Sequence, residues 1–183
     1  MSLFDRHFAH WPPGLPKSLP VPRTSIYYNL EVSARRYPDK AAIVYYGTEL
    51  TYAELAETIE RLAGFLVERL GVARNDRVLL YLQNSPQYVI AYYAVLRANA
   101  VVVPVNPMNR VAELRHIAAD TGARAAIVGQ ELFGFFEPIL SDFPKLQAII
   151  ACYADYVREE TDLPLPAAVA NAPDAVPHAQ AVA

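Results

Sequence analysis

The sequence predicts an α/β fold, a mostly parallel sheet with helices on both faces. Between residues 26 and 157, a leading helix is followed by apolar runs and helical stretches in the order β-β-α-β-α-β-α-β-α-β. Alternation with short connections is typical of a parallel sheet crossed by helices. The strand segments are continuously apolar, as in strands covered on both faces. We therefore expect five or six strands and no second compact domain.

The first elements are predicted by turn and capping chemistry. Residues 26–36 have the pattern of a short helix, and residues 41–52 that of two strands around a turn at Gly47. Thr51 and Glu54 have the spacing of a capping box, in which each side chain satisfies a free backbone N–H of the other residue. The helix that follows carries an apolar stripe close to the 3.6-residue period, formed by Leu55, Ile59, Leu62, Leu66 and Leu70.

The later elements alternate strictly. Ser85 followed by Pro86 predicts a helix start, and Asn109 predicts the cap of the next helix. The run Val101–Val105 predicts a buried strand, but Pro104 fits best at a strand end, an edge or a bulge, so pairing should weaken there. The other strands are predicted at residues 77–83, 123–129 and 146–153, and the intervening helices at 88–98, 111–121 and 131–140.

Composition divides the chain into three parts. Residues 1–25 form a Pro-rich N-terminal arm, with five prolines between residues 11 and 25. Residues 26–157 form the α/β subdomain. Residues 158–183 are rich in Ala and Pro, show no period and are interpreted as a linker or tail.

Charge and composition exclude several classes of function. The formal net charge is −3, so the basic surface that nucleic acid binding requires is missing. No apolar run approaches the roughly 20 residues of a transmembrane helix, whereas peripheral contact with a membrane stays open. The N-terminus does not resemble a secretory signal, and Cys152 is the single cysteine. Together these features predict a reducing, cytoplasmic setting and no metal site.

Catalytic motifs are absent from the sequence, and two loops remain as candidate binding elements. Neither nucleotide-binding glycine motif nor a G-x-S-x-G elbow occurs, so no catalytic residue is assigned. The loops at residues 83–87 and 106–110 each follow a predicted strand and precede a helix. Ligands of open α/β sheets bind at this edge, and free helix amides favour anions. Plain helix capping is the alternative for both loops.

An ordered series of short segments extends from residue 37 to residue 129. They are PDK-A (38–41), LTYAEL (50–55), DRV (76–78), QNSPQ (83–87) and VVPVNPMNR, followed by EL at 113–114. In this order and spacing they resemble the N-terminal part of the adenylate-forming (AMP-binding) enzymes, most of all the long-chain fatty acid–CoA ligases. Asn75 and Asn99 stand where that family often has glycine, and asparagine also tolerates the positive φ of a turn.

The resemblance implies an incomplete N-terminal portion of the large domain of these enzymes. The full-length enzyme would use ATP, Mg²⁺ and CoA to convert a fatty acid or other carboxylate into acyl-adenylate and then into acyl-CoA. The family's phosphate loop and C-terminal domain find no match here, so the 183-residue chain alone is expected to be inactive. The resemblance places Asn106, Pro107, Met108 and Asn109 near the approach of CoA.

Two other functions stay open at this stage. One is an adenylate-forming enzyme for another carboxylic acid, because acid class and chain length are not readable from this segment. The other is a stand-alone α/β binding module without catalysis. A truncated parallel sheet should expose apolar surface, so we expect self-association, with a homodimer as the simplest form, unless local repacking covers that surface.

Overall fold

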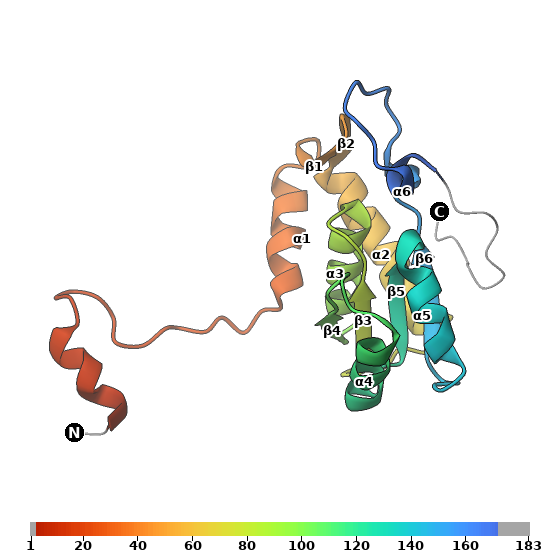
Figure 1. The fold of residues 1–183 in the computed structure, drawn as a ribbon. Coiled ribbons are helices and arrows are strands. Elements are labelled where there is room, and N and C mark those ends of the chain that lie inside the picture. The colour runs from red at the N-terminus through yellow and green to blue at the C-terminus, as the bar shows by residue number, and fades with distance from the viewer. Residues whose placement is uncertain (1–2, 172–183) are drawn as a thin grey trace.

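The computed structural model describes residues 3–171 of the chain and contains six helices, six strands and three 3-10 helices there (Figure 1). The predicted tail beyond residue 171 lies outside the described residues. In chain order the elements are η1 (Leu3–His10), α1 (Ile26–Arg36), β1 (Ala41–Tyr45), β2 (Thr48–Thr51), α2 (Tyr52–Glu68), β3 (Arg77–Tyr81), α3 (Pro86–Arg97), β4 (Val101–Pro104), α4 (Val111–Thr121), β5 (Ala125–Gly129), η2 (Gln130–Leu132), α5 (Phe133–Leu140), β6 (Gln147–Ala151), η3 (Tyr153–Tyr156) and α6 (Ala167–Ala170).

The six strands form two sheets. Four of them pair in parallel in the order β4-β3-β5-β6, which confirms the predicted mostly parallel α/β fold. β1 and β2 form a separate antiparallel hairpin. Its turn residues Tyr46 and Gly47 have φ of 48° and 88°, the left-handed conformation that two-residue hairpin turns require. Asn75 and Asn99 also have positive φ, so the two asparagines do take up turn conformations there.

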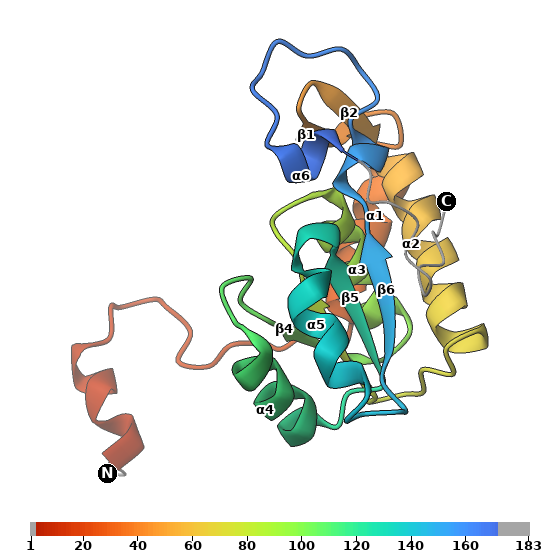
Figure 2. The ribbon, with the colours of Figure 1, turned by 45° about the vertical axis from the view of Figure 1, so that its right-hand side comes forward.

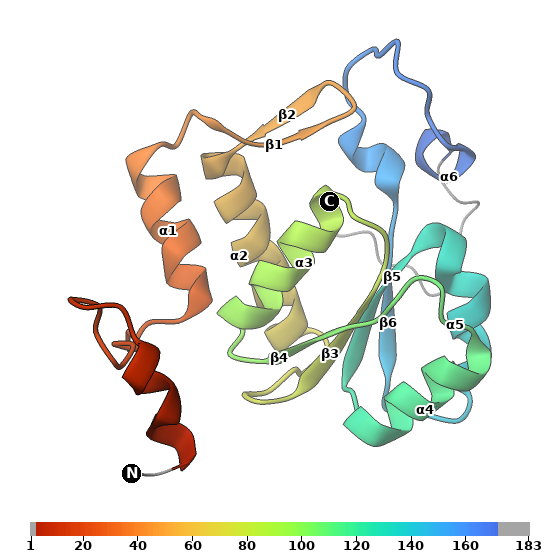
Figure 3. The ribbon, with the colours of Figure 1, turned by 60° about the vertical axis from the view of Figure 1, so that its left-hand side comes forward.

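Helices cover both faces of the parallel sheet. Figure 3 shows α1, α2 and α3 on one side of the strands and α4 and α5 on the other. Side chains alternate between the two faces of a strand, so Val78 and Leu80 of β3 join the cluster with α2 and α3. Leu79 and Tyr81 join the second cluster, with α4 and α5. All four side chains are fully buried, which makes β3 the centre of the core.

Most predicted helix starts are confirmed. The Thr51 hydroxyl accepts from the Glu54 N–H, and the Glu54 carboxylate accepts from the Thr51 N–H, which completes the capping box of α2. Ser85 caps α3, with Pro86 in the first turn. The predicted cap at Asn109 is wrong, because the N-cap of α4 is Arg110. The Asn109 carbonyl is instead held by the Tyr81 hydroxyl.

β4 is an edge strand, and the prediction that Val101–Val105 is buried is wrong for most of its length. Val101 is 42% exposed, because nothing in the described chain pairs with the outer side of β4. The Val101 N–H donates to the Asp76 carbonyl just before β3, and the Val105 N–H donates to the Leu80 carbonyl in β3. The intervening Pro104 nitrogen therefore faces outward. The edge position expected for Pro104 is thus confirmed, and no sheet hydrogen bond is lost.

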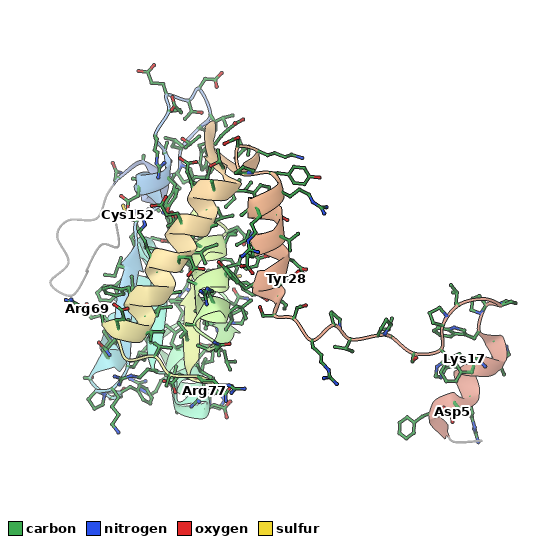
Figure 4. The ribbon with its side chains drawn as sticks, turned by 180° about the vertical axis from the view of Figure 1, so that it is seen from behind. Asp5, Lys17, Tyr28, Arg69, Arg77 and Cys152 are labelled. Carbon is green, nitrogen blue, oxygen red and sulfur yellow. The ribbon has the colours of Figure 1, made fainter. Side chains whose placement is uncertain are left out.

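The segments on the two sides of the α/β subdomain differ in whether they pack against it. The N-terminal arm, η1 and the extended residues after it, stands away from the sheet, as the positions of Asp5 and Lys17 show (Figure 4). After β6 the chain returns over the hairpin, where the Thr48 hydroxyl accepts from the N–H groups of Arg158 and Glu159 (Figure 2). No helix in residues 3–171 is long and apolar enough to cross a membrane.

The buried side chain of Tyr153 joins the carboxyl ends of three strands. Its hydroxyl accepts from the Gln83 N–H beyond β3 at 2.9 Å and donates to the Glu131 carboxylate beyond β5 at 3.3 Å. Burial raises the pKa of Tyr153, so the hydroxyl stays a proton donor. Gly129 makes room for it, since a Cβ there would overlap the Tyr153 hydroxyl oxygen.

This close approach predicts opposite effects for two glycine-to-alanine substitutions. Gly129→Ala should lower the free energy of unfolding by about 1–3 kcal/mol, because the methyl group overpacks the Tyr153 contact. Gly64→Ala, in the interior of α2 with open space around it, should raise that energy by about 0.5–1 kcal/mol. Urea denaturation followed by circular dichroism measures both. Equal stability of the two variants would contradict the proposed role of Gly129.

Candidate functional site

A hollow of about 290 Å³ lies at the carboxyl ends of β3 and β4. It forms where the two neighbouring parallel strands end and their chains diverge into the loops that precede α3 and α4, the place where ligands bind in open α/β sheets. Its lining consists of Leu82, Gln83, Asn84, Tyr88, Pro104, Val105, Asn106 and Pro107.

The structure brings the two predicted loops together but separates the four predicted residues into two pairs. Asn106 and Pro107 line the hollow together with Gln83 and Asn84 from the other loop. Met108 is not among the lining residues and points into solvent, with 78% of its side chain exposed. Asn109 is also outside the lining, and its backbone is turned inward. Only half of the predicted set is therefore in a position to touch a ligand in this hollow.

Asn106 organises the loop that carries it. Its side-chain oxygen accepts from the Met108 N–H at 2.9 Å, and its carbonyl accepts from the Asn109 N–H at 2.9 Å. Pro107, between them, has no N–H. The backbone donors of residues 107–109 are thus either missing or used within the turn.

The carbonyls of the same loop accept hydrogen bonds from two side chains. The Arg110 guanidinium donates to the carbonyls of Pro107, Met108 and Asn109 at 3.1, 2.8 and 3.0 Å. The Tyr81 hydroxyl, at the end of β3, donates to the Asn109 carbonyl at 2.6 Å. Arg110 closes the candidate loop 106–110 but had no role of its own in the sequence. Tyr81 had none either, because no sequence pattern indicates its contact with this loop.

Capping groups occupy part of the helix N-termini beside the hollow. In α3, Pro86 has no N–H, and the Tyr88 N–H donates to the Ser85 hydroxyl and carbonyl. In α4, the Glu113 carboxylate accepts from its own N–H and from that of Arg110, and these bonds hold its pKa below the usual value. Both loops thus carry capping contacts, which reduce the number of amides that could attract an anion there.

The lining of the hollow is neutral. None of its residues carries a formal charge, and its polar groups are the carboxamides of Gln83, Asn84 and Asn106 and the Tyr88 hydroxyl. Such groups donate and accept single hydrogen bonds at fixed points. The hollow can therefore bind and orient a neutral segment of a ligand, and it contains no group for acid–base or nucleophilic catalysis.

The other reactive groups in the described chain are explained structurally. A second hollow of about 310 Å³ between α1 and α2 is rimmed by carboxylates, but Glu31, Glu57 and Glu60 each pair with an arginine. The thiol of Cys152 is half-buried, and burial raises its pKa, which disfavours the reactive thiolate. Within residues 3–171 no group of three His, Cys, Asp or Glu side chains could hold a metal ion.

The chain matches a known family over most of its length. Residues 30–182 match the family described as AMP-binding enzyme. The long-chain-fatty-acid–CoA ligase of Bacillus subtilis is 38% identical over 125 residues, which are 68% of this chain and 22% of that protein. Triostin synthetase I of Streptomyces triostinicus is also 38% identical, over 122 residues, which are 66% of this chain and 23% of that protein.

A solved structure shows the same fold. The long-chain-fatty-acid-CoA ligase of Archaeoglobus fulgidus superposes with a TM-score of 0.68 at 28% identity, covering 77% of this chain and 30% of that protein. The chain thus spans between about a fifth and a third of the length of these relatives. It belongs to the AMP-binding family of adenylate-forming enzymes.

Proposed function

We propose that the chain is the N-terminal portion of an AMP-forming fatty acid–CoA ligase. In the first step a carboxylate oxygen attacks the α-phosphorus of ATP and pyrophosphate leaves. In the second step the sulfur of CoA attacks the acyl carbonyl carbon, AMP leaves and the thiol proton is released. The observation that carries the proposal is the 38% identity to a long-chain-fatty-acid–CoA ligase, supported by the fold shared with a second such ligase.

The part of this chain in that reaction is to bind and orient CoA. The hollow beside Asn106 and Pro107 is neutral, and it suits the uncharged, amide-containing pantetheine chain better than the CoA phosphates. Met108, at the solvent side, and Asn109, held by Tyr81, complete the loop. ATP and Mg²⁺ are supplied for the first step, but no residue of the described chain forms a site that fits them, so we assign none.

A ligase for another carboxylic acid is the second candidate. A salicyl-AMP ligase of Mycobacterium tuberculosis is 38% identical over 131 residues, the same identity as that of the B. subtilis fatty acid ligase. Identity in these two proteins therefore does not separate the acids, and the fold shared with the A. fulgidus fatty acid ligase is why the fatty acid is the first candidate. A stand-alone binding module is the third candidate, and a natural stop codon directly after Ala183 would favour it.

We also propose a cytoplasmic setting, the division at residues 25 and 157, and no nucleic acid partner. The single cysteine and the net charge of −3 support the setting and the absence of a nucleic acid partner. Support for the division comes from α1 starting at Ile26, directly after the arm.

ATP–pyrophosphate exchange tests the proposed activity. The chain of residues 1–183 should show no exchange with any acid, because it has no phosphate-binding loop and no metal ligands among its described residues. The full-length product of the gene should exchange pyrophosphate with fatty acids. A panel of fatty, aryl and amino acids identifies the substrate class. If the full-length product shows no pyrophosphate exchange with any acid of the panel, the assignment is contradicted.

Exposed apolar side chains predict self-association of residues 1–183, with a homodimer as the simplest form. Ile26, Val44 and Val101 are 55%, 64% and 42% exposed, and β4 presents an open sheet edge. The sedimentation coefficient should rise with protein concentration, and Val101→Lys should reduce that rise because charge on an edge strand opposes pairing. A constant monomer mass over a hundredfold concentration range would rule the association out.

A further inference from the structure

We propose that Arg110 is a positioning residue for the thioester-forming step, and that it acts by fixing the loop at residues 106–109. The inference rests on the proposed function, in which this loop is the wall against which CoA is oriented. Arg110 itself lines no part of the hollow. Its effect on a ligand is therefore indirect and passes through the backbone of the loop.

One nitrogen of the Arg110 side chain forms hydrogen bonds to several backbone carbonyls of the loop. Nη1 donates to the carbonyls of three consecutive residues, Pro107, Met108 and Asn109. Three consecutive carbonyls converge on one donor only if the chain curls around it. Because a charged donor forms stronger hydrogen bonds than a neutral one, this contact holds the curled conformation.

The guanidinium is itself held from the opposite side. It lies over the ring of Phe135 in α5, with 4.3 Å between the guanidinium carbon and the ring centroid. The planar guanidinium can stack on a ring while it donates in its own plane, which the compact ammonium group of lysine cannot do. The loop after β4 is thereby connected to a helix that follows β5.

A second contact, from β3, sets the same orientation. The Tyr81 hydroxyl donates to the Asn109 carbonyl, and the Tyr81 ring is fully buried against the core. With their carbonyls turned toward Arg110 and Tyr81, the loop residues present Asn106 and Pro107 to the hollow. Loss of either contact frees acceptors that can rotate toward the hollow and alter its wall.

Measuring the two half-reactions of the full-length enzyme separately distinguishes this role from a general effect on folding. Arg110→Met removes the three hydrogen bonds, and we expect the KM for CoA to rise about tenfold. Pyrophosphate exchange, which needs no CoA, should stay within about twofold of the wild type. Arg110→Lys should recover part of the loss, and Tyr81→Phe should raise the KM for CoA about threefold.

Arg115→Met is the matched control. Arg115 lies one turn further along α4 and forms an ion pair with Asp142 at 2.8 Å, away from the loop. Arg110 is the N-cap of α4 and Arg115 lies in its first half, so both variants lose one positive charge at the same end of the molecule. The KM for CoA of Arg115→Met should equal that of the wild type. An equal rise in both variants, or no rise in Arg110→Met and Tyr81→Phe, would overturn the inference.

Hydrogen exchange on residues 1–183 tests the contact without any enzymatic activity. The Met108 and Asn109 amides both donate to Asn106, so their exchange reports opening of the loop. Exchange should become faster in Arg110→Met and stay unchanged in Arg115→Met. If hydrogen exchange of these amides is unchanged in Arg110→Met, the positioning role is refuted even if the full-length protein is a ligase. If the full-length protein shows no pyrophosphate exchange, the ligase assignment is refuted, and the hydrogen-exchange measurement remains valid.

Discussion

The pairing of β3 with β4 on one side and β5 on the other is the interaction on which the rest of the structure depends. Every side chain of β3 from Val78 to Tyr81 is fully buried, alternately against the helices of the two faces. Parallel pairing brings the carboxyl ends of these strands to one edge. The loops at residues 83–87 and 106–110 therefore become neighbours although a whole helix separates them in sequence, and the hollow forms between them.

The chemistry of this edge follows from how its backbone groups are satisfied. In many α/β proteins the free amides of the following helices bind phosphates. Here Pro86, Ser85 and Glu113 remove or occupy some of those amides, and Asn106 occupies the donors of its own turn. A site without charge gains little by attracting an anion, and a neutral ligand costs less to desolvate there than a charged one. The edge is thus suited to shape and amide recognition.

Local patterns in the sequence predict those features that depend on neighbouring residues. The box of Thr51 and Glu54 and the Ser85–Pro86 start are confirmed, because capping involves groups within one helical turn. The Asn109 cap is wrong because the competing contacts are distant in sequence, Tyr81 in β3 and Phe135 in α5. The exposure of Val101 depends on strand order, which a valine-rich run cannot reveal. Tyr153 was missed for the same reason, since it meets Gln83 across 70 residues.

The neutral wall also explains why the two steps of the proposed reaction would use different parts of the enzyme. Adenylation develops charge on phosphate oxygens, which requires cationic groups or free amides close to the reacting atoms. The lining of the hollow carries no cationic group, so it offers little stabilisation to that step. Thioester formation instead requires that a long, flexible and largely neutral chain be held in one orientation, and the gain comes from restricted motion. The loop held by Arg110 and Tyr81, with Asn106 and Pro107 lining the hollow, provides a rigid surface of that kind.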